Sequence, residues 1–202
     1  MKNLTNKRIL LGVSGSISAY KAPDIVRRLQ DLGAEVRVIL TTGGSKFITP
    51  LSLQSISKHK VYDNLWDSEA ELAMGHIELA KWADLILIAP ASANTIATIA
   101  NGKATDLLSS IMLASDTIVM IAPAMNQQMY LSSAVQENLQ ALESRKITII
   151  TPDSGPQACG DNGPGRLPKS SNIANQVASQ FQSTQLSGKN ITITLGATLE
   201  AI

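Results

Sequence analysis

Residues 85–90 read LILIAP and residues 118–123 read IVMIAP, and these two stretches decide the fold. Neither run alternates apolar with polar residues, as a strand with one face in water would. A continuous apolar run of this length is typical of a strand in a parallel sheet that is covered on both faces. The two stretches therefore predict two buried strands of one sheet, each ending in Ala-Pro.

The segments around these two runs repeat the alternation of strand and helix. RILLGV (8–13), EVRVILTT (35–42) and ITIITP (147–152) are further short apolar runs. Helical spacing of apolar residues predicts helices over 19–33, which Gly33 ends, over 127–145 and over 171–182. This order predicts an α/β fold with a doubly wound, mostly parallel open sheet of the Rossmann or flavodoxin type.

Composition limits the kind of protein this chain can be. It has 202 residues, 44% of them hydrophobic, and a net charge of +1 without basic clusters, which argues against a nucleic-acid partner. No apolar run is long enough for a membrane span, and the first residues lack the pattern of a secretory signal, so we expect a cytoplasmic protein. A single cysteine excludes an intrachain disulfide and a multi-thiolate zinc site, and we expect no metal.

The carboxyl end of the sequence has a different character from the rest. A polar stretch, QSTQLSGKN (182–190), separates the last predicted helix from a new strand-like run that begins ITITLG. We therefore expect residues 1–187 to form one domain. Residues 188–202 are expected to be a linker and the first strand of a second domain that this chain does not contain.

The loops after the first two predicted strands are rich in glycine and hydroxyl groups. They read GVSGSIS (12–18) and LTTGGS (40–45), without the dinucleotide pattern G-x-G-x-x-G and without an acidic residue to hold a ribose. Backbone N–H groups and hydroxyls at a helix start bind phosphate well, so a mononucleotide is favoured over NAD. For the first loop, ordinary turn chemistry is an equally good explanation.

The third and fourth predicted strands end in similar tips, IAPASANT (88–95) and IAPAMNQQM (121–129). Because proline cannot donate to a sheet, Pro90 and Pro123 are expected to end the strands. The amides of Asn94 and Asn126 suit the polar edge of a heterocycle or a carboxylate. Helix capping is the alternative for these tips, and for Ser92 we favour it.

The only cysteine of the chain, Cys159, lies in GPQACGDNGPGR (155–166). This stretch is so rich in glycine and proline that we expect neither helix nor strand there. Outside a packed core, and without a disulfide partner, the thiol is expected to serve in chemistry, as a nucleophile or as an acid.

Five stretches of the sequence are informative when they are taken together: GSISAYK (15–21), GHIELAKWAD (75–84), PASANT (90–95), PAMNQQM (123–129) and ACGDNGPGR (158–166). This set of motifs resembles the homo-oligomeric flavin-containing cysteine decarboxylases. The resemblance covers residues 7 to about 185. It implies bound FMN and conversion of 4′-phosphopantothenoylcysteine into 4′-phosphopantetheine, with loss of carbon dioxide, in coenzyme A biosynthesis. It also implies a homo-oligomer, a trimer or a multiple of trimers, in which a neighbouring subunit completes the flavin site.

The resemblance also implies roles for particular residues. His76, Asn126 and Cys159 would be catalytic, with Asn126 binding the substrate's carboxylate. Of the two uses left open for the solitary thiol, we expect Cys159 to act as the acid that donates a proton. The substrate would also contact Pro156, Gln157 and Ala158. The flavin would lie against Gly15, Ser16, Ile17, Ser92, Ala93, Asn94, Thr95 and Ala124, with its phosphate near Thr42 and Ser45.

Two other functions are compatible with the same fold. A flavin prenyltransferase is disfavoured by the PAMN and ACGD stretches, and a non-enzymatic FMN-binding regulatory subunit would be expected to lose His76, Asn126 or Cys159.

The chain departs from the family at Ser16 and Ser18, where relatives often carry glycine and alanine. LGATLEAI (195–202) departs from the opening of the ligase half of the bifunctional relatives, so the resemblance implies neither ligase activity nor a CTP site for this chain.

Overall fold

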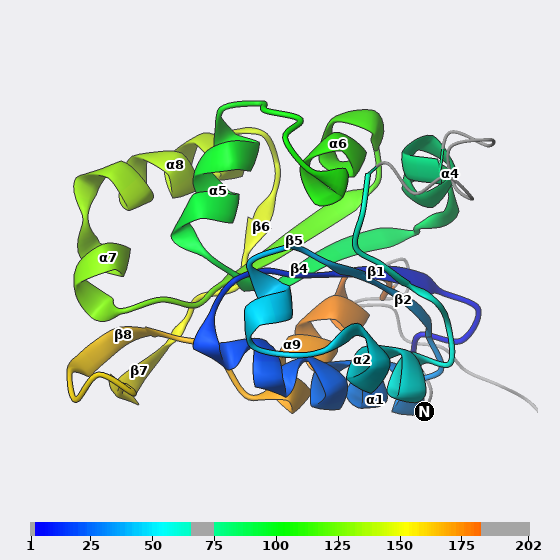
Figure 1. Cartoon of the computed structure of the whole chain (residues 1–202), viewed down its shortest axis with the longest axis horizontal. Helices are drawn as coiled ribbons and strands as arrows, with labels where there is room; N and C mark the ends of the chain where they lie inside the picture. The colour runs from blue at the N-terminus through cyan, green and yellow to red at the C-terminus, as the bar shows by residue number, and fades with distance from the viewer. Residues whose placement is uncertain (1–2, 66–74, 183–202) are drawn as a thin grey trace, which may run out of the picture.

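The computed structural model describes residues 3–65 and 75–182. Its centre is a six-stranded sheet with the strand order β3-β2-β1-β4-β5-β6, in which all the neighbouring pairs are parallel (Figure 1). The strands are β1 (Arg8–Val13), β2 (Glu35–Leu40), β3 (Val61–Tyr62), β4 (Leu85–Ala91), β5 (Ile118–Pro123) and β6 (Thr148–Ile149). This order confirms the doubly wound fold. It reverses between β1 and β4, and ligands of such sheets bind beyond the carboxyl ends of the strands at that point.

Helices cover both faces of the sheet (Figure 1). One layer contains α1 (Ala22–Asp31), α2 (Pro50–Ser57) and α9 (Ser170–Ser179), with α1 in contact with the other two. The opposite layer contains α4 (Gly75–Trp82), α5 (Ala93–Ala100), α6 (Leu107–Ala114) and α8 (Ser133–Ser144). Short elements complete the described chain: the 3₁₀ helices η1 (Ile17–Lys21) and η2 (Gly44–Lys46), and α7 (Gln127–Leu131).

The two layers explain why the central strands read as continuous apolar runs. Successive side chains of a strand point to opposite faces, so alternate residues enter different cores. In β4, Leu85 and Leu87 belong to the core under α1 and α9, whereas Ile86 and Ile88 belong to the core under α5 and α6. These four side chains are fully buried. A strand with two buried faces has no position for a polar side chain, as the sequence predicted.

Several element boundaries differ from the expectations. The predicted helix over 127–145 is two helices, because Ser132 ends α7 and its hydroxyl accepts from the backbone N–H of Val135 (3.4 Å), which starts α8. β6 is only two residues long. Pro90 does not end β4, because Ala91 still pairs with Pro123, and the carbonyl of Pro90 accepts the backbone N–H of Ser14 (3.2 Å).

The segment around Cys159 is a β-hairpin, and the expectation of a segment without strands is wrong. β7 (Asp153–Pro156) and β8 (Asn162–Arg166) pair antiparallel, and Cys159 lies in the turn between them. Glycines make these strands possible where other residues would be strained, since Gly155 and Gly165 have φ of +147° and +120°. Figure 1 shows the hairpin at the left end of the molecule, beyond the carboxyl ends of the central strands.

Two further expectations concern the whole chain. Residues 188–202, expected to form a linker and a first strand, lie outside the described residues, so the domain boundary stays a prediction. Within the described part of the chain, no helix is long and apolar enough to cross a membrane.

Candidate active site

A cavity of about 450 Å³ lies at the carboxyl ends of β1, β4 and β5, where the strand order reverses. Its walls come from five separate segments of the chain: the β1–η1 loop with η1, the start of α5, the β5–α7 loop, the β7–β8 hairpin, and Phe47 after η2. The sequence-predicted residues that line it are Gly15, Ser16, Ile17, Ser92, Ala93, Ala124, Asn126, Pro156, Gln157, Ala158 and Cys159.

The loops after β1 and β2 pack directly against each other through glycines. A Cβ atom at Gly15 would lie 3.1 Å from backbone atoms of Gly43, and one at Gly44 would lie 2.6 Å from the carbonyl oxygen of Val13. Ser16 accepts the backbone N–H of Ser18 (3.3 Å) as the N-cap of η1. The two glycine loops therefore form one compact unit, of which Gly15 and Ser16 line the cavity.

A fully buried serine joins the ends of β1 and β4. The hydroxyl of Ser14 donates to the carbonyl of Pro90 and accepts from the backbone N–H of Ser92, both at 2.8 Å. Ser92 in turn accepts from the backbone N–H of Thr95 (3.3 Å), which confirms its expected capping role. Ser92 also lines the cavity, whereas Thr95 and the exposed Asn94 are not among its lining residues.

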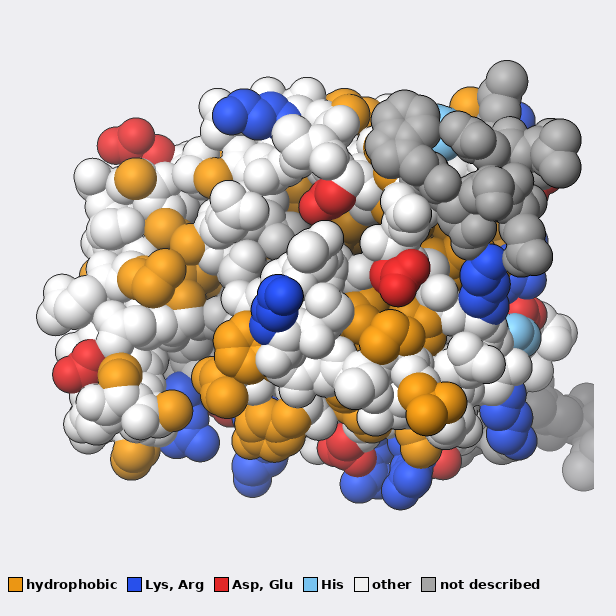
Figure 2. Space-filling view, in the orientation of Figure 1, with side chains coloured by type: hydrophobic (Ala, Val, Ile, Leu, Met, Phe, Trp, Pro, Cys, Tyr) orange, Lys and Arg blue, Asp and Glu red, His pale blue; other side chains and the backbone are white. Residues whose placement is uncertain are grey.

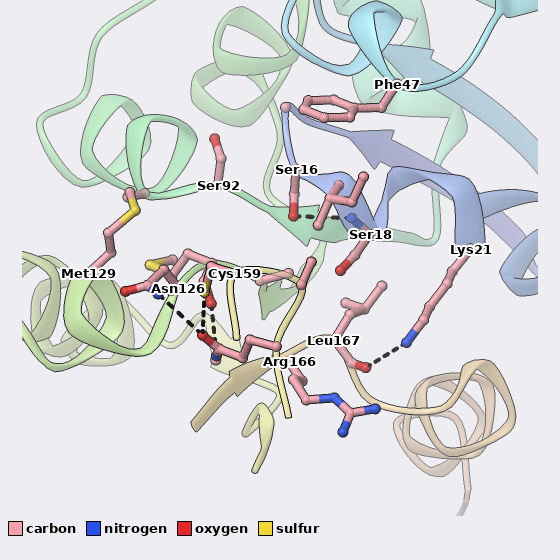
Figure 3. Close-up of a pocket in the computed structure, with 18 of the residues that line it drawn as sticks. Ser16, Ser18, Lys21, Phe47, Ser92, Asn126, Met129, Cys159, Arg166 and Leu167 are labelled. Carbon is pink, nitrogen blue, oxygen red and sulfur yellow. Dashed lines mark hydrogen bonds between the residues drawn. The ribbon is translucent and has the colours of Figure 1, made fainter. Parts of the chain in front are cut away.

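The side chain of Asn126 makes four hydrogen bonds at the cavity. Its Oδ1 accepts the backbone N–H of Gln128 (2.8 Å), as the N-cap of α7. Because a backbone N–H can only donate, this bond fixes which end of the amide is oxygen. The Nδ2 group therefore faces the hairpin, where it approaches Asp161 Oδ2 (2.6 Å), Cys159 Sγ (3.1 Å) and Gln157 Oε1 (3.4 Å). Figure 3 shows Asn126 and Cys159 side by side at the cavity.

Three acceptors thus compete for the two hydrogens of one amide. The shortest contact is to a carboxylate, and the exposed thiol of Cys159 donates to the same carboxylate oxygen of Asp161 (3.4 Å). This arrangement is suited to binding carboxylates beside a thiol. Asp161 was not predicted from the sequence, although its position two residues after the cysteine was the available signal.

The hairpin is fastened to the β5–α7 loop by backbone and amide hydrogen bonds. The N–H of Met125 donates to the carbonyl of Gly165 (2.9 Å), and the N–H of Gln127 donates to Gln157 Oε1 (2.9 Å). The other end of the Gln157 side chain donates to the carbonyl of Pro164 (3.1 Å). Gln157 is therefore a bridge that sets the position of Cys159 over the cavity.

Large apolar side chains around the cavity are exposed. Ile17, Tyr20, Phe47 and Met129 line it, and their exposed fractions lie between 46% and 62%. Figure 2 shows exposed apolar side chains over the lower half of the viewed face, where α1 and α2 lie in Figure 1. Exposed apolar groups beside polar ones are typical of a ligand site or an interface.

Two cations also line the cavity, on the side away from Asn126. The ammonium of Lys21 donates to the carbonyl of Leu167 (3.2 Å), and Arg166 precedes that residue at the end of β8. Burial lowers the pKa of Lys21 from its ordinary value, and the charge of Arg166 lowers it further against the opposing effect of Asp153. Both cations lie within stretches that carry the family resemblance, GSISAYK and ACGDNGPGR, but neither was expected to have a role in the site.

Besides Asn94 and Thr95, three further predicted site residues lie outside the cavity lining. Thr42 and Ser45 are exposed in the turn after β2, where the Ser45 hydroxyl donates to the carbonyl of Thr42 (2.9 Å). His76 lies on α4, which packs against α6. Figure 1 shows α4 and the β7–β8 hairpin at opposite ends of the molecule, so one chain does not bring His76 to Cys159.

Comparison with known proteins gives one family and several close relatives. The Flavoprotein family model matches residues 1–182. The Coenzyme A biosynthesis bifunctional protein CoaBC of Escherichia coli (strain K12) is 53% identical over 201 residues, which are 99% of this chain and 50% of the relative. The chain therefore spans about half the length of the curated relatives it matches.

Two solved structures share the fold. One is a cysteine-to-serine mutant of a PPC decarboxylase complexed with pantothenoylaminoethenethiol, with 34% identity, a TM-score of 0.77, and coverage of 88% of this chain and 99% of the other. The other is the FMN binding protein AtHal3, with 34% identity, a TM-score of 0.74, and coverage of 88% and 98%. The match over nearly all of the described residues shows that this chain belongs to the Flavoprotein family.

Proposed function

We propose that this protein is an FMN-dependent decarboxylase that converts 4′-phosphopantothenoylcysteine into 4′-phosphopantetheine for coenzyme A biosynthesis. The observation that carries the proposal is the cluster in which the Asn126 amide faces both a carboxylate and the Cys159 thiol. Family membership and the similarity to a PPC decarboxylase support it. The proposed enzyme is cytoplasmic, in line with its single cysteine and balanced charge.

The residues of the cavity fit FMN. The glycines at 15, 43 and 44 let the first two loops pack backbone to backbone, and this packing sets the position of Gly15 and Ser16 at the cavity. Ser16 and Ser92 offer hydroxyls, and the exposed side chains of Ile17, Phe47 and Met129 offer apolar surface for a flat ring. We propose that these residues hold the flavin, with its phosphate toward Thr42 and Ser45.

A cofactor is needed because the carboxylate of an N-acyl cysteine has no electron sink of its own. Bound FMN would supply one by accepting a hydride from the thiol-bearing carbon and returning it later. The resulting thioaldehyde of the substrate can accept the electrons left when carbon dioxide departs. What remains for the protein is to orient the substrate and to deliver a proton.

Asn126 orients the substrate in this proposal. Its amide is held by the N-cap bond to Gln128, so its Nδ2 hydrogens point into the cavity before any ligand arrives. A substrate carboxylate would take the place that Asp161 has in the structure. The amide itself keeps its orientation when the carboxylate of the substrate replaces that of Asp161, and a fixed donor favours one orientation of the reacting carbon.

Cys159 delivers the proton. It lies in the hairpin turn, within 3.1 Å of the amide that would hold the carboxylate, and its sulfur is the only thiol of the chain. Loss of carbon dioxide leaves an ene-thiolate, and the carbon that carried the carboxylate must then gain a proton. The Cys159 thiol would face that carbon and is the proposed proton donor.

His76 requires a second copy of the chain. Because α4 and the hairpin lie at opposite ends of the molecule, His76 would reach the site of a neighbouring copy, and we propose a trimer or a multiple of trimers as the active unit. The exposed apolar rim of the cavity supports this proposal, since a neighbour would cover it. Mixing equal amounts of inactive His76→Asn and Asn126→Asp chains should then restore about a quarter of the wild-type activity.

The proposed function is tested with purified protein. The protein should contain FMN by absorbance, and incubation with 4′-phosphopantothenoylcysteine should release carbon dioxide and yield 4′-phosphopantetheine. Light scattering should give a multiple of three chains. A protein that retains FMN but releases no carbon dioxide would overturn the proposed reaction and leave the flavin site standing.

A further inference from the structure

Two positively charged side chains lie at one end of the cavity, and neither forms an ion pair with any of the described residues. Lys21 leaves η1 and Arg166 ends β8, and both line the cavity although 145 residues of sequence separate them. Figure 3 shows the Lys21 ammonium and the Arg166 guanidinium on the same side of the cavity, away from Asn126. The bond from Lys21 to the carbonyl of Leu167 (3.2 Å) fixes this end of the cavity.

The arrangement leaves positive charge unneutralised. The ion pairs within the described residues involve Arg8, Arg28, Arg37 and His59, and neither Lys21 nor Arg166 takes part in one. Asp153 is near enough to favour the charged form of Lys21. The ion pairs among the described residues nevertheless do not include one between Asp153 and Lys21. The lowered pKa of Lys21 agrees with this geometry, because burial and Arg166 both oppose its charge.

The charge and geometry select the ligand. An arginine guanidinium binds the oxygens of a phosphate in pairs, and a lysine adds a compact positive charge. The opposite end of the cavity has the amide of Asn126, which suits a single carboxylate. One cavity thus offers two anion sites. The uncharged amide of Asn126 forms the weaker site, beside the thiol, and the two cations form the stronger site at the opposite end.

We propose that Lys21 and Arg166 bind the terminal phosphate monoester of the substrate and thereby select phosphorylated over unphosphorylated substrates. This inference rests on the proposed function for the identity of the substrate. The same chemistry occurs in the phosphate of FMN, which we place at the turn of Thr42 and Ser45 after β2. The test therefore has to separate the two sources of phosphate.

Binding can be measured without turnover. The FMN-loaded protein is titrated calorimetrically with 4′-phosphopantothenate and with pantothenate, which differ only in the phosphate. Wild type should bind the phosphorylated compound at least about tenfold more tightly, since hydrogen bonds to charged groups have effects of this size. Lys21→Met and Arg166→Gln should each weaken that binding about tenfold and leave pantothenate binding unchanged.

Arg27→Gln is the matched control. Arg27 is exposed on α1 and does not line the cavity, so its replacement removes one positive charge without touching the site. This variant should bind both compounds as wild type does. If Arg27→Gln loses as much affinity as Lys21→Met, the effect is one of net charge, and the proposed site is wrong.

Two further outcomes would overturn the inference. Variants that lose FMN but keep the preference for 4′-phosphopantothenate would assign the two cations to the cofactor. Variants that keep both FMN and the preference would leave them without a role in phosphate binding. Because the titrations need no catalysis, a preference that depends on Lys21 and Arg166 in a protein that releases no carbon dioxide would uphold this site and overturn the proposed reaction instead.

Discussion

The amide nitrogen of Asn126 lies 2.6 Å from a carboxylate oxygen of Asp161, the shortest of the contacts it makes with the hairpin. In the proposed reaction the same amide binds the carboxylate of the substrate. Two carboxylates cannot share that position without strong repulsion. The side chain of Asp161 therefore has to leave Asn126 when the substrate arrives, and it can return once carbon dioxide has gone.

Replacement of Asp161 by asparagine should therefore strengthen the binding of ligands that carry a carboxylate. The competing charge is gone, so the affinity for 4′-phosphopantothenoylserine, which has the carboxylate but not the thiol, should rise at least about tenfold. The affinity for 4′-phosphopantetheine, which has no carboxylate, should not change. Calorimetric titration of both compounds measures the difference, and a parallel change for the two would show that Asp161 does not compete for this position.

Replacement of Asn126 by aspartate should have the opposite effect. A second carboxylate would face Asp161 and repel the substrate, so turnover should fall about 100-fold or more while FMN stays bound. Gln128→Glu adds the same charge two residues along α7, at an exposed position outside the cavity, and should retain activity. Carbon dioxide release and the flavin spectrum are measured for both. Equal losses in the two variants would argue against a specific role for Asn126.

Replacement of Cys159 by serine should stop the reaction after decarboxylation. Oxidation and loss of carbon dioxide precede the proton transfer, and a hydroxyl is a much weaker acid than a thiol. The variant should bind FMN, release carbon dioxide and accumulate an ene-thiol two hydrogens lighter than 4′-phosphopantetheine, which mass spectrometry detects. Formation of the normal product at the parental rate would exclude Cys159 as the acid.

Replacement of Gly165 by alanine should lower activity more than it lowers the stability of the fold. Gly165 has a φ of +120°, and a Cβ atom there would clash with the carbonyl oxygen of Met125, the residue whose N–H holds the hairpin. Gly160 has a φ of +91° but open space around its Cβ position, so Gly160→Ala carries only the conformational cost of about 1 kcal/mol. We expect Gly165→Ala to lose most activity and Gly160→Ala to keep it, with thermal unfolding as the common control.

Replacement of Lys21 by methionine should change the pH dependence of stability. The pKa of Lys21 is lowered in the folded protein, first by burial and then by Arg166, so the unfolded chain binds the proton more tightly. Below the lowered pKa both states are protonated, and the folded state carries the cost of the charge. The free energy of unfolding of wild type should therefore rise as pH increases through the lowered pKa toward the ordinary value of 10.5.

Lys21→Met removes this cost together with the hydrogen bond to Leu167, and only the first effect depends on pH. The free energy of unfolding of Lys21→Met relative to wild type should therefore be highest below the lowered pKa and should fall as the pH rises. Denaturant titrations across that range measure it. Lys169→Met, at an exposed position where the side chain makes no capping bond, is the control and should follow wild type. A constant difference between Lys21→Met and wild type at every pH would contradict the prediction.

The sheet could be predicted from sequence because burial on two faces leaves a clear pattern. LILIAP and IVMIAP have no polar position, and only a strand between two helical layers permits that. The break between α7 and α8 left no such pattern, because Ser132 stops one helix and caps the next within an otherwise helical stretch. The hairpin was missed for a related reason. Its strands consist of residues with poor strand propensity, and contacts with Met125 and Gln127 stabilise them instead.

The site was predicted in part. Residues next to strand ends, such as Ser92 and Asn126, could be found because the ends of parallel strands meet at one edge. Asp161, Lys21 and Arg166 could not, since their roles depend on how the hairpin folds back onto the β5–α7 loop. The distance of His76 from the hairpin was equally invisible in a linear motif, because nothing in a motif says which copy of the chain contributes the residue.

The position of Cys159 has a practical consequence for anyone who studies this protein. The chain has one thiol, and that thiol is exposed in the turn over the cavity. A thiol reagent will therefore modify one known atom, and the number of thiols titrated equals the number of candidate sites in a preparation. A fluorophore or spin label attached there would report ligand occupancy without background from other positions, and protection of the thiol by added compounds offers a direct screen for ligands.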